Sequence, residues 1–362
     1  MRALRFDSFG GRPYVHDEPD PVAAADGAVI RVEATGLCRS DWHGWQGHDP
    51  DIALPHVPGH EFAGVVDAVG SAVLRFQPGD RVTVPFVCAC GRCGPCLAGD
   101  QQVCDDQVQP GFTQWGSFAD LVRIDRADLN LIAVPDAMSS VTAAALGCRF
   151  ATAYRAVRSQ GDVRPGQWVA VLGCGGVGLS AVMIAVAAGA QVVAVDVVPE
   201  ALRLARDLGA AAEVAALPGP GAAERVAAEI RSITGGGAHL GIDALGSADT
   251  CLASILGLRK RGRHVQVGLL PPQNGRPAVP MDQVVARELE VVGSHGMAAH
   301  AYPAMLAEIA SGLLRPDRLV TRTIGLDDAA DALIALSAGT EPGVTVIVPG
   351  LHRQDPLHQG AP

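Results

Sequence analysis

The feature that most constrains the fold of this chain is a glycine-rich turn between an apolar run and an alanine-rich run. The sequence "WVAVLG" at residues 168–173 predicts a buried strand, and "GLSAVMIAVAAGA" at residues 178–190 predicts a helix. Gly173, Gly175 and Gly178 have the G-x-G-x-x-G spacing. A strand that turns directly into a helix in this way is typical of a parallel sheet covered by helices, so the pattern predicts an α/β fold.

The same turn predicts a dinucleotide site. The first glycine permits the tight turn, the second lets the backbone approach a pyrophosphate, and the third lets helix and strand pack closely. The helix N-terminus attracts phosphates. Asp196 ends the next predicted strand, where its carboxylate would accept hydrogen bonds from the adenosine ribose and repel the extra phosphate of NADP. Because Val197 and Val198 offer no cation, the sequence favours NAD over NADP.

The rest of the chain predicts two domains. Its 362 residues exceed the roughly 250–300 residues that one hydrophobic core serves. Strands and helices alternate over residues 150–293, which predicts the NAD-binding domain. Residues 1–149 consist of short extended runs punctuated by glycine and proline, which predicts a β-rich domain. Residues 294–362 are expected to return to that β-rich domain.

Charge and apolar patterning exclude two classes of partner. Lys and Arg number 28 against 38 Asp and Glu, and the net charge of −10 disfavours a nucleic acid partner. The opening "MRALRFDSFG" lacks the apolar core of a secretory signal, and Gly189, Gln191 and Asp196 interrupt the most apolar stretch. We therefore expect a soluble, cytoplasmic protein with no membrane partner. In a reducing compartment, its nine cysteines are expected to be metal ligands or buried residues rather than disulfides.

A cysteine-rich segment predicts a structural zinc site. In "CACGRCGPCLAGDQQVC", residues 88–104, two gaps of two residues and one of seven separate Cys90, Cys93, Cys96 and Cys104. Four thiolates at this spacing can surround one tetrahedral zinc and leave no position open for substrate, which predicts a structural lobe over about residues 88–106. Cys88 is surplus and is interpreted as a bystander, with replacement of one ligand as the alternative. A redox relay is less favoured.

A second set of metal ligands is scattered along the chain. Cys38, His60 and Cys148 would supply three ligands and leave a fourth position for water or substrate, as a catalytic zinc requires.

Taken together, these motifs resemble the zinc-dependent alcohol dehydrogenases of the medium-chain dehydrogenase/reductase superfamily. The resemblance covers nearly the whole chain and rests on "GLCRSDWH", "GHEFAGVVDAVGSAV", the four-cysteine lobe, "LGCRFATAYRAV", "GCGGVG" and Asp196. It implies a GroES-like β-rich catalytic domain and a Rossmann domain with a doubly wound parallel sheet.

The resemblance also implies roles for individual residues. Cys38, His60 and Cys148 would bind the catalytic zinc, with Glu61 beside it as a neighbour or occasional ligand. Asp41 would orient the zinc-bound histidine. Ser40 would take the alcohol proton, and His43 would pass it through the cofactor ribose to solvent. The implied cofactor-binding residues are Arg39, Gly173, Gly175, Gly176, Val177, Gly178, Asp196, Val267, Gly268 and Leu269.

The predicted function is the reversible oxidation of an alcohol to an aldehyde or ketone, with hydride transfer to NAD and two zinc ions per subunit. A homo-oligomer, dimer or tetramer, is expected by analogy with related enzymes. A polyol dehydrogenase and a biosynthetic carbonyl or imine reductase are alternatives that use the same parts. A catalytically silent NAD-binding protein is an alternative of another class, disfavoured because all the ligands are present. His48 and His56 match no motif position and are interpreted as surface or structural residues, and His295 is expected to border the nicotinamide without an assigned role.

Overall fold

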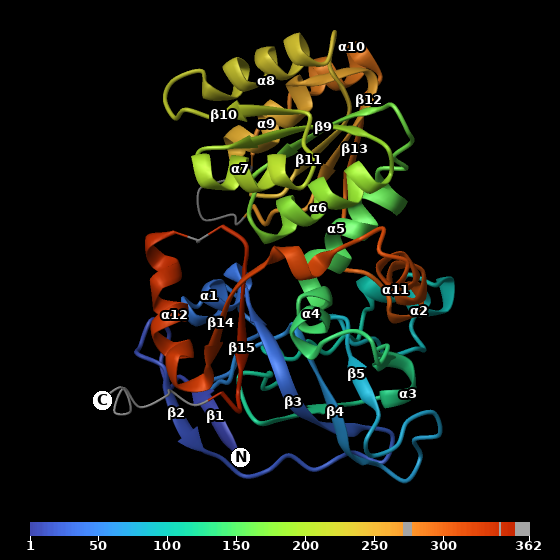
Figure 1. Ribbon diagram of the computed structural model, residues 1–362, viewed down its shortest axis with the longest axis vertical. Helices are drawn as coiled ribbons and strands as arrows, with labels where there is room; N and C mark the ends of the chain where they lie inside the picture. The colour runs from blue at the N-terminus through green and yellow to red at the C-terminus, as the bar shows by residue number, and fades with distance from the viewer. Residues whose placement is uncertain (271–276, 340–341, 352–362) are drawn as a thin grey trace, which may run out of the picture. The chain divides into compact units, whose positions relative to one another are not determined.

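The computed structural model describes residues 1–270, 277–339 and 342–351 (Figure 1). The contacts divide these residues into two compact units. The first unit contains residues 1–147, 322–339 and 344–351, and the second contains residues 148–270, 277–321 and 342–343. Among the described residues, no helix is both long enough and apolar enough to cross a membrane.

The first unit is built on a seven-stranded sheet. Its strand order is β14 (Val320–Gly325), β15 (Val344–Val348), β3 (Ala28–Leu37), β4 (Phe62–Val69), β5 (Arg81–Thr83) and β7 (Ile132–Ala133), with β6 (Leu121–Ile124) also paired with β3. Strand β3 pairs antiparallel with β15, β4 and β6. Strands β1 (Arg2–Arg5) and β2 (Tyr14–Asp17) pair antiparallel and form a separate two-stranded sheet. The β-rich domain predicted from the sequence is confirmed.

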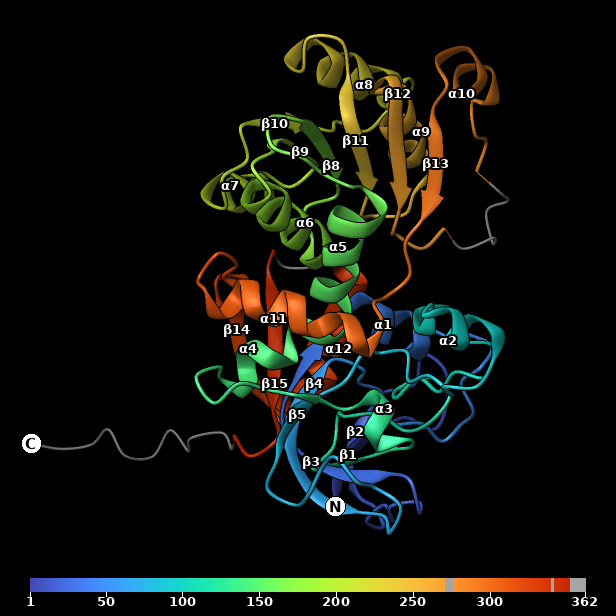
Figure 2. The same cartoon turned by 90° about the vertical axis from the view of Figure 1, so that its right-hand side faces the viewer.

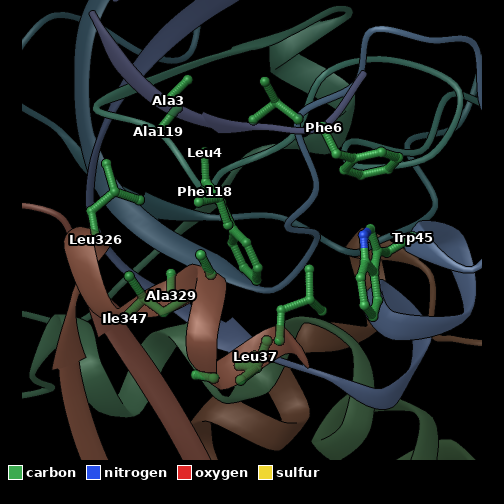
Figure 3. Close-up of a cluster of buried hydrophobic side chains, with 14 of the residues drawn as sticks. Ala3, Leu4, Phe6, Leu37, Trp45, Phe118, Ala119, Leu326, Ala329 and Ile347 are labelled. Carbon is green, nitrogen blue, oxygen red and sulfur yellow. The ribbon is translucent and has the colours of Figure 1, made fainter. Parts of the chain in front are cut away.

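Short helices connect and cover the strands of the first unit. They are α1 (Arg39–Trp45), α2 (Gly94–Ala98), α3 (Ala127–Asn130), α4 (Ser140–Ala144) and α12 (Ala329–Ala335), with 3₁₀ turns η1 (Gln101–Val103), η7 (Leu326–Asp328) and η8 (Leu336–Ala338). Helix α1 packs against α12 and η8. Figure 3 shows Leu37, two residues before α1, and Trp45, the last residue of α1, within a buried apolar cluster that also contains Phe118 and Ile347. The cluster therefore fixes both ends of α1 (Figure 3).

The second unit contains a six-stranded parallel sheet. Its order is β10 (Ala212–Ala215), β9 (Gln191–Asp196), β8 (Trp168–Leu172), β11 (Ala238–Asp243), β12 (Leu258–Gln266) and β13 (Glu290–Gly293). All five neighbouring pairs are parallel. The chain winds outward from β8 in one direction and then returns to β11, so the order reverses between β8 and β11. This is the 3-2-1-4-5-6 order of a doubly wound dinucleotide-binding sheet, as predicted.

Helices cover both faces of this sheet (Figure 2). Helix α6 (Gly176–Ala187) packs with α7 (Pro199–Asp207), and α8 (Ala222–Ile233) packs with α9 (Ala248–Leu256). The remaining helical elements of the unit are η2 (Leu146–Phe150), α5 (Ala151–Arg155), η3 (Ala156–Gln160), α10 (Met281–Arg287), η5 (Ala299–Ala301), α11 (Tyr302–Ala310) and η6 (Pro316–Leu319).

The contacts place residues 294–321 in a different unit from the one that the sequence predicted. The sequence predicted a return to the β-rich domain from residue 294, but the contacts place this segment in the second unit up to Thr321. Helix α11 carries Glu308, which accepts hydrogen bonds from the Tyr154 hydroxyl at 2.9 Å and from Arg158 at 2.7 Å. Its residues Tyr302, Met305 and Leu306 are buried, and the helix contacts α5 and η5 of the same unit. The sequence and the contacts differ because periodicity predicts that α11 has an apolar face but does not predict which unit that face packs against.

Candidate metal and nucleotide sites

Four side chains from distant parts of the chain meet in one group. Cys38 is the residue before α1, His60 and Glu61 precede β4, and Cys148 lies in η2 directly after Gly147. Their ligand atoms all lie within 4.8 Å of one another. Gly147 permits this approach, because a Cβ at that position would lie 3.1 Å from the Glu61 Cα. The three ligands predicted from the sequence, and Glu61 with them, are therefore brought together.

Asp41 fixes the orientation of His60. Its Oδ1 lies 2.9 Å from His60 Nδ1 and accepts a hydrogen bond from the Gly59 amide, while its Oδ2 accepts one from the Cys38 amide at 2.8 Å. Asp41 and His60 are both fully buried. One carboxylate thus joins the start of α1 to the loop that carries His60, in the position predicted for it.

The other nitrogen of His60 has the surroundings expected of a metal ligand. Nε2 is buried and has no hydrogen-bond partner within the described residues. A buried polar atom without a partner is costly, and a neutral imidazole held at Nδ1 by a carboxylate directs the lone pair of Nε2 to a metal. Burial by itself would lower the pKa of His60, but the Asp41 carboxylate raises that pKa well above its usual value. The donor set fits zinc, with two thiols, one imidazole and a carboxylate.

The four cysteines of the predicted lobe also form a group. Their sulfur atoms lie within 4.8 Å of one another, with Cys90 and Cys96 at 3.9 Å and Cys93 and Cys104 at 3.7 Å. Zn–S bonds of about 2.3 Å in a tetrahedron require sulfur separations of about 3.8 Å. The amide of Arg92 donates to Cys90 and helps lower the pKa of that thiol to about 6. The residues fit a four-thiolate zinc site.

Three cysteines, Cys88, Cys174 and Cys251, lie outside the metal groups and are buried. Cys88 is packed in the apolar core beside β4 and β5, and burial raises the pKa of its thiol to about 12. It is outside both metal groups, in agreement with its interpretation as a bystander. Cys174 is buried, and burial likewise raises its pKa to about 12, as expected for a small filler.

The glycine turn has the geometry that the motif predicts. Gly173 has φ of +89°, and a Cβ on Gly178 would lie 1.7 Å from the Gly173 carbonyl oxygen. Gly175 precedes α6, and a Cβ there would meet nothing within 4 Å, which leaves the space that a pyrophosphate needs. Asp196 at the end of β9 accepts hydrogen bonds from the amides of Cys174 at 2.6 Å and Val198 at 2.9 Å.

The loop after β12 contains three more of the predicted cofactor residues, and it lies against the loop after β11. A Cβ on Gly268 would lie 2.2 Å from the Gly246 amide nitrogen, so the loop with Val267, Gly268 and Leu269 lies directly against residue 246. The sequence did not single out Asp243. Its buried carboxylate accepts hydrogen bonds from the amides of Leu245 and Gly246 and from the Gln266 side chain. The only feature of the sequence that could have indicated a role for Asp243 is its position at the end of a predicted strand.

Arg149 is a second residue that the sequence did not single out. Its side chain is buried against the glycine turn, because a Cβ on Gly176 would lie 2.5 Å from Arg149 Cδ. Its position next to Cys148 was the only signal.

Helix α1 carries the residues predicted for proton transfer. Ser40 and His43 are three positions apart and therefore share a side of the helix. Arg39 stacks on the Trp42 ring at 3.8 Å and donates a hydrogen bond to the Leu336 carbonyl. Burial, and then the charge of Arg39, lower the pKa of His43.

The two histidines interpreted as surface or structural residues differ in the structure. His56 is buried, and its Nε2 lies 2.9 Å from the Gly111 carbonyl, which is a structural role. His48 is exposed, but its Nδ1 lies 2.9 Å from His43 Nδ1. His295 is exposed in the segment after β13.

Comparison with known proteins gives matches along most of the chain. Residues 24–136 match the family described as Alcohol dehydrogenase GroES-like domain, and residues 176–311 match the family described as Zinc-binding dehydrogenase. An NAD-dependent alcohol dehydrogenase of Sulfurisphaera tokodaii is 32% identical over 96% of this chain and 100% of its own length. An alcohol dehydrogenase of Geobacillus stearothermophilus is 33% identical over 81% of this chain and 84% of its own. A crystal structure of an NAD-dependent alcohol dehydrogenase superposes with a TM-score of 0.86 at 32% identity, covering 97% of this chain and 100% of that one.

Proposed function

This chain belongs to the zinc-dependent alcohol dehydrogenase family of the medium-chain dehydrogenase/reductase superfamily, and on that premise we propose that Cys38, His60 and Cys148 bind its catalytic zinc. The protein is an NAD-linked oxidoreductase that acts on the CH–OH group of a small-molecule alcohol. The same proposal assigns a structural zinc to Cys90, Cys93, Cys96 and Cys104.

The observation that carries the catalytic assignment is the buried Nε2 of His60. It has no hydrogen-bond partner among the described residues, yet it lies in a group with two thiols and a carboxylate. A purely structural histidine at this depth would be expected to use both ring nitrogens. Glu61 is the fourth member of the group, and we propose that it occupies a position beside the metal or binds it when the substrate position is vacant.

The proposed chemistry divides between the bound groups and the side chains. Zinc, when bound, lowers the pKa of an alcohol and so makes its proton transferable near neutral pH. NAD, when bound, supplies the hydride acceptor. The Ser40 hydroxyl accepts the alcohol proton and donates its own onward, and His43 carries the proton toward solvent. Asp41 holds His60 in the tautomer that leaves Nε2 available.

The proposed cofactor site begins at the glycine turn. The amides at the start of α6 would bind the pyrophosphate, with Arg39 as a further cationic contact. Asp196 would accept hydrogen bonds from the ribose and exclude the additional phosphate of NADP. Val267, Gly268 and Leu269 would form the wall of the site beyond the carboxyl ends of the strands.

The proposed function is tested with a panel of alcohols, aldehydes and ketones. We expect NADH to form with at least one alcohol, and NADPH to form much more slowly from NADP. Absence of NAD reduction with every alcohol, in protein that contains two zinc ions per chain, would contradict the proposal.

Replacement of Asp41 by Asn should weaken zinc binding by about 10–100-fold, because the partner that orients a metal-bound histidine is lost. The pH dependence should change as well. Since the Asp41 carboxylate raises the pKa of His60, its removal lowers that pKa, and protons should compete with zinc only at lower pH than in the wild type. Zinc competition with a chromophoric chelator across pH measures both effects. Equal zinc affinity in both proteins at all pH values would contradict the role of Asp41.

Replacement of Cys96 by Ser should lower the zinc content from two ions to one per chain and leave the group around His60 loaded. Loss of one thiolate opens the four-thiolate site, so amide hydrogen exchange should accelerate over residues 88–106. Cys88→Ser is the matched control, because Cys88 is equally buried in the same segment but outside the metal group. Two zinc ions in Cys96→Ser would contradict the assignment.

We also propose that the protein is cytoplasmic and forms a homo-oligomer, either a dimer or a tetramer. These two proposals are tested by cell fractionation and by light scattering of the purified protein.

A further inference from the structure

The side chains of His43 and His48 meet because of the way α1 ends. The His48 amide donates to the His43 carbonyl, and the Gly47 amide donates to the Gly44 carbonyl, with Gly47 in the left-handed region at φ of +75°. This pair of bonds is a Schellman motif, which commonly brings the residue after the glycine against the last turn of the helix. Here that contact joins two imidazoles, with ring centroids 5.2 Å apart.

The contact between the rings is a hydrogen bond that holds one proton. The two Nδ1 atoms are 2.9 Å apart, so one of them must carry hydrogen while the other accepts. Each ring therefore leaves its Nε2 for a different neighbour. This arrangement lets a proton enter at one ring and leave from the other.

Trp42 holds both rings in this orientation. Its ring makes edge contacts with His43 at 5.0 Å and His48 at 5.6 Å between centroids. Trp42 is itself fixed, because its Nε1 donates to Ser337 Oγ at 2.9 Å and Arg39 stacks on its face. The hydrogen-bonded pair is thus pre-organised by packing on α1 and η8.

The surroundings of the two rings differ in a way that favours outward transfer. His43 is half-buried, and burial and then the positive charge of Arg39 lower its pKa. The charge of His48 also lowers the pKa of His43, whereas the charge of Cys38 raises it. His48 is exposed, so water can reach its ring. A proton that reaches His43 is poorly held there and has an adjacent acceptor.

We infer that His48 extends the proton relay by one residue and delivers the proton of the alcohol to water; this inference rests on the proposed function, in which His43 receives that proton. The incoming proton binds His43 Nε2. The N–H bond at His43 Nδ1 breaks as a new N–H bond forms at His48 Nδ1, and His48 Nε2 then loses its proton to water. One proton enters and one leaves, and exchange with water restores the starting tautomers. In the reducing direction the same steps run backward.

His48→Gln tests the inference through the pH profile of alcohol oxidation. Gln removes the imidazole ring but keeps a polar side chain of similar reach. We expect kcat to fall by about tenfold near neutral pH, less than the roughly 10²-fold or more for a group that transfers the proton directly. The loss should shrink at high pH, where hydroxide accepts the proton from His43, and added imidazole buffer should restore the rate. His16→Gln, which replaces an exposed histidine of β2, is the matched control and should behave as wild type.

Two further comparisons separate a relay from a structural effect. The double variant His43→Gln/His48→Gln should be no slower than His43→Gln alone, because both residues act in one path. The ¹⁵N resonances of the His43 ring should change in His48→Gln and not in His16→Gln, a readout that needs no turnover.

Two outcomes would overturn the inference. One is a His48→Gln pH profile that matches wild type. The other is a loss that is equal at every pH and is not rescued by imidazole. If wild-type protein itself reduces no NAD with any alcohol, the proposed function fails, and this inference fails with it; wild-type turnover with an unaffected His48→Gln overturns only the extended relay.

Discussion

Cys38→Ser should abolish alcohol oxidation, with kcat/KM lower by about a thousandfold or more, and should leave one zinc per chain. Cys38 supplies a buried thiol to the group with His60 and Cys148, and serine is a far weaker ligand for zinc than a thiolate. Loss of the metal removes several kcal/mol of transition-state stabilisation, and each 1.4 kcal/mol is about tenfold in rate. Initial rates of NADH formation and metal analysis on the same preparation measure the effect.

The matched control for this variant is Cys251→Ser. Cys251 is as buried as Cys38, in helix α9 of the second unit, but it belongs to neither metal group. We expect it to retain two zinc ions and most of the activity. Unchanged activity in Cys38→Ser would contradict the catalytic assignment, and so would full zinc content in an inactive variant.

Gly178→Ala should destabilise the second unit and weaken its NAD binding together. The added Cβ would lie 1.7 Å from the Gly173 carbonyl oxygen, which is backbone and cannot move aside without opening the turn. Overpacking of this kind costs about 1–3 kcal/mol of unfolding free energy. Displacement of α6 from the turn should also weaken NAD binding by at least about tenfold. Chemical denaturation and NAD titration by calorimetry provide the two readouts.

Gly175→Ala separates packing from binding at the same turn. An added Cβ there meets nothing within 4 Å, and the backbone is not in the left-handed region, so stability should stay within about 0.5 kcal/mol of wild type. NAD binding should still weaken, because the methyl group would occupy the space left for the pyrophosphate. Equal NAD affinity in Gly175→Ala and wild type would contradict the location of the cofactor phosphates.

Local motifs were enough to predict the nucleotide unit and the four-cysteine group. The spacing of Gly173, Gly175 and Gly178 is dictated by close backbone contacts, so a short sequence window carries the whole constraint. The lobe cysteines lie close in sequence, and their spacing alone predicts that their sulfurs meet. The convergence of Cys38, His60 and Cys148 was different, because it depends on the fold and was predicted through resemblance to a family.

The features that were missed depend on contacts that no periodicity reveals. The apolar side of α11 was visible, but whether it packs against α5 or against the β-rich sheet is decided by side chains such as Glu308 and Tyr154. His48 matched no motif because its position follows from the cap at Gly47, which turns the chain back toward His43. A glycine at the end of a short helix, followed by a histidine, was the only local signal.

We propose that turnover depends on a zinc ion held by Cys38, His60 and Cys148, separate from the zinc of the four-cysteine lobe. The most direct measurement follows NADH formation while a chelator removes zinc to one ion per chain and while zinc is then returned. The rate should fall to zero as the content drops from two to one and recover in proportion to the second zinc. Full activity in protein that has lost the zinc of Cys38, His60 and Cys148 and keeps only the zinc of the four-cysteine lobe would contradict this assignment.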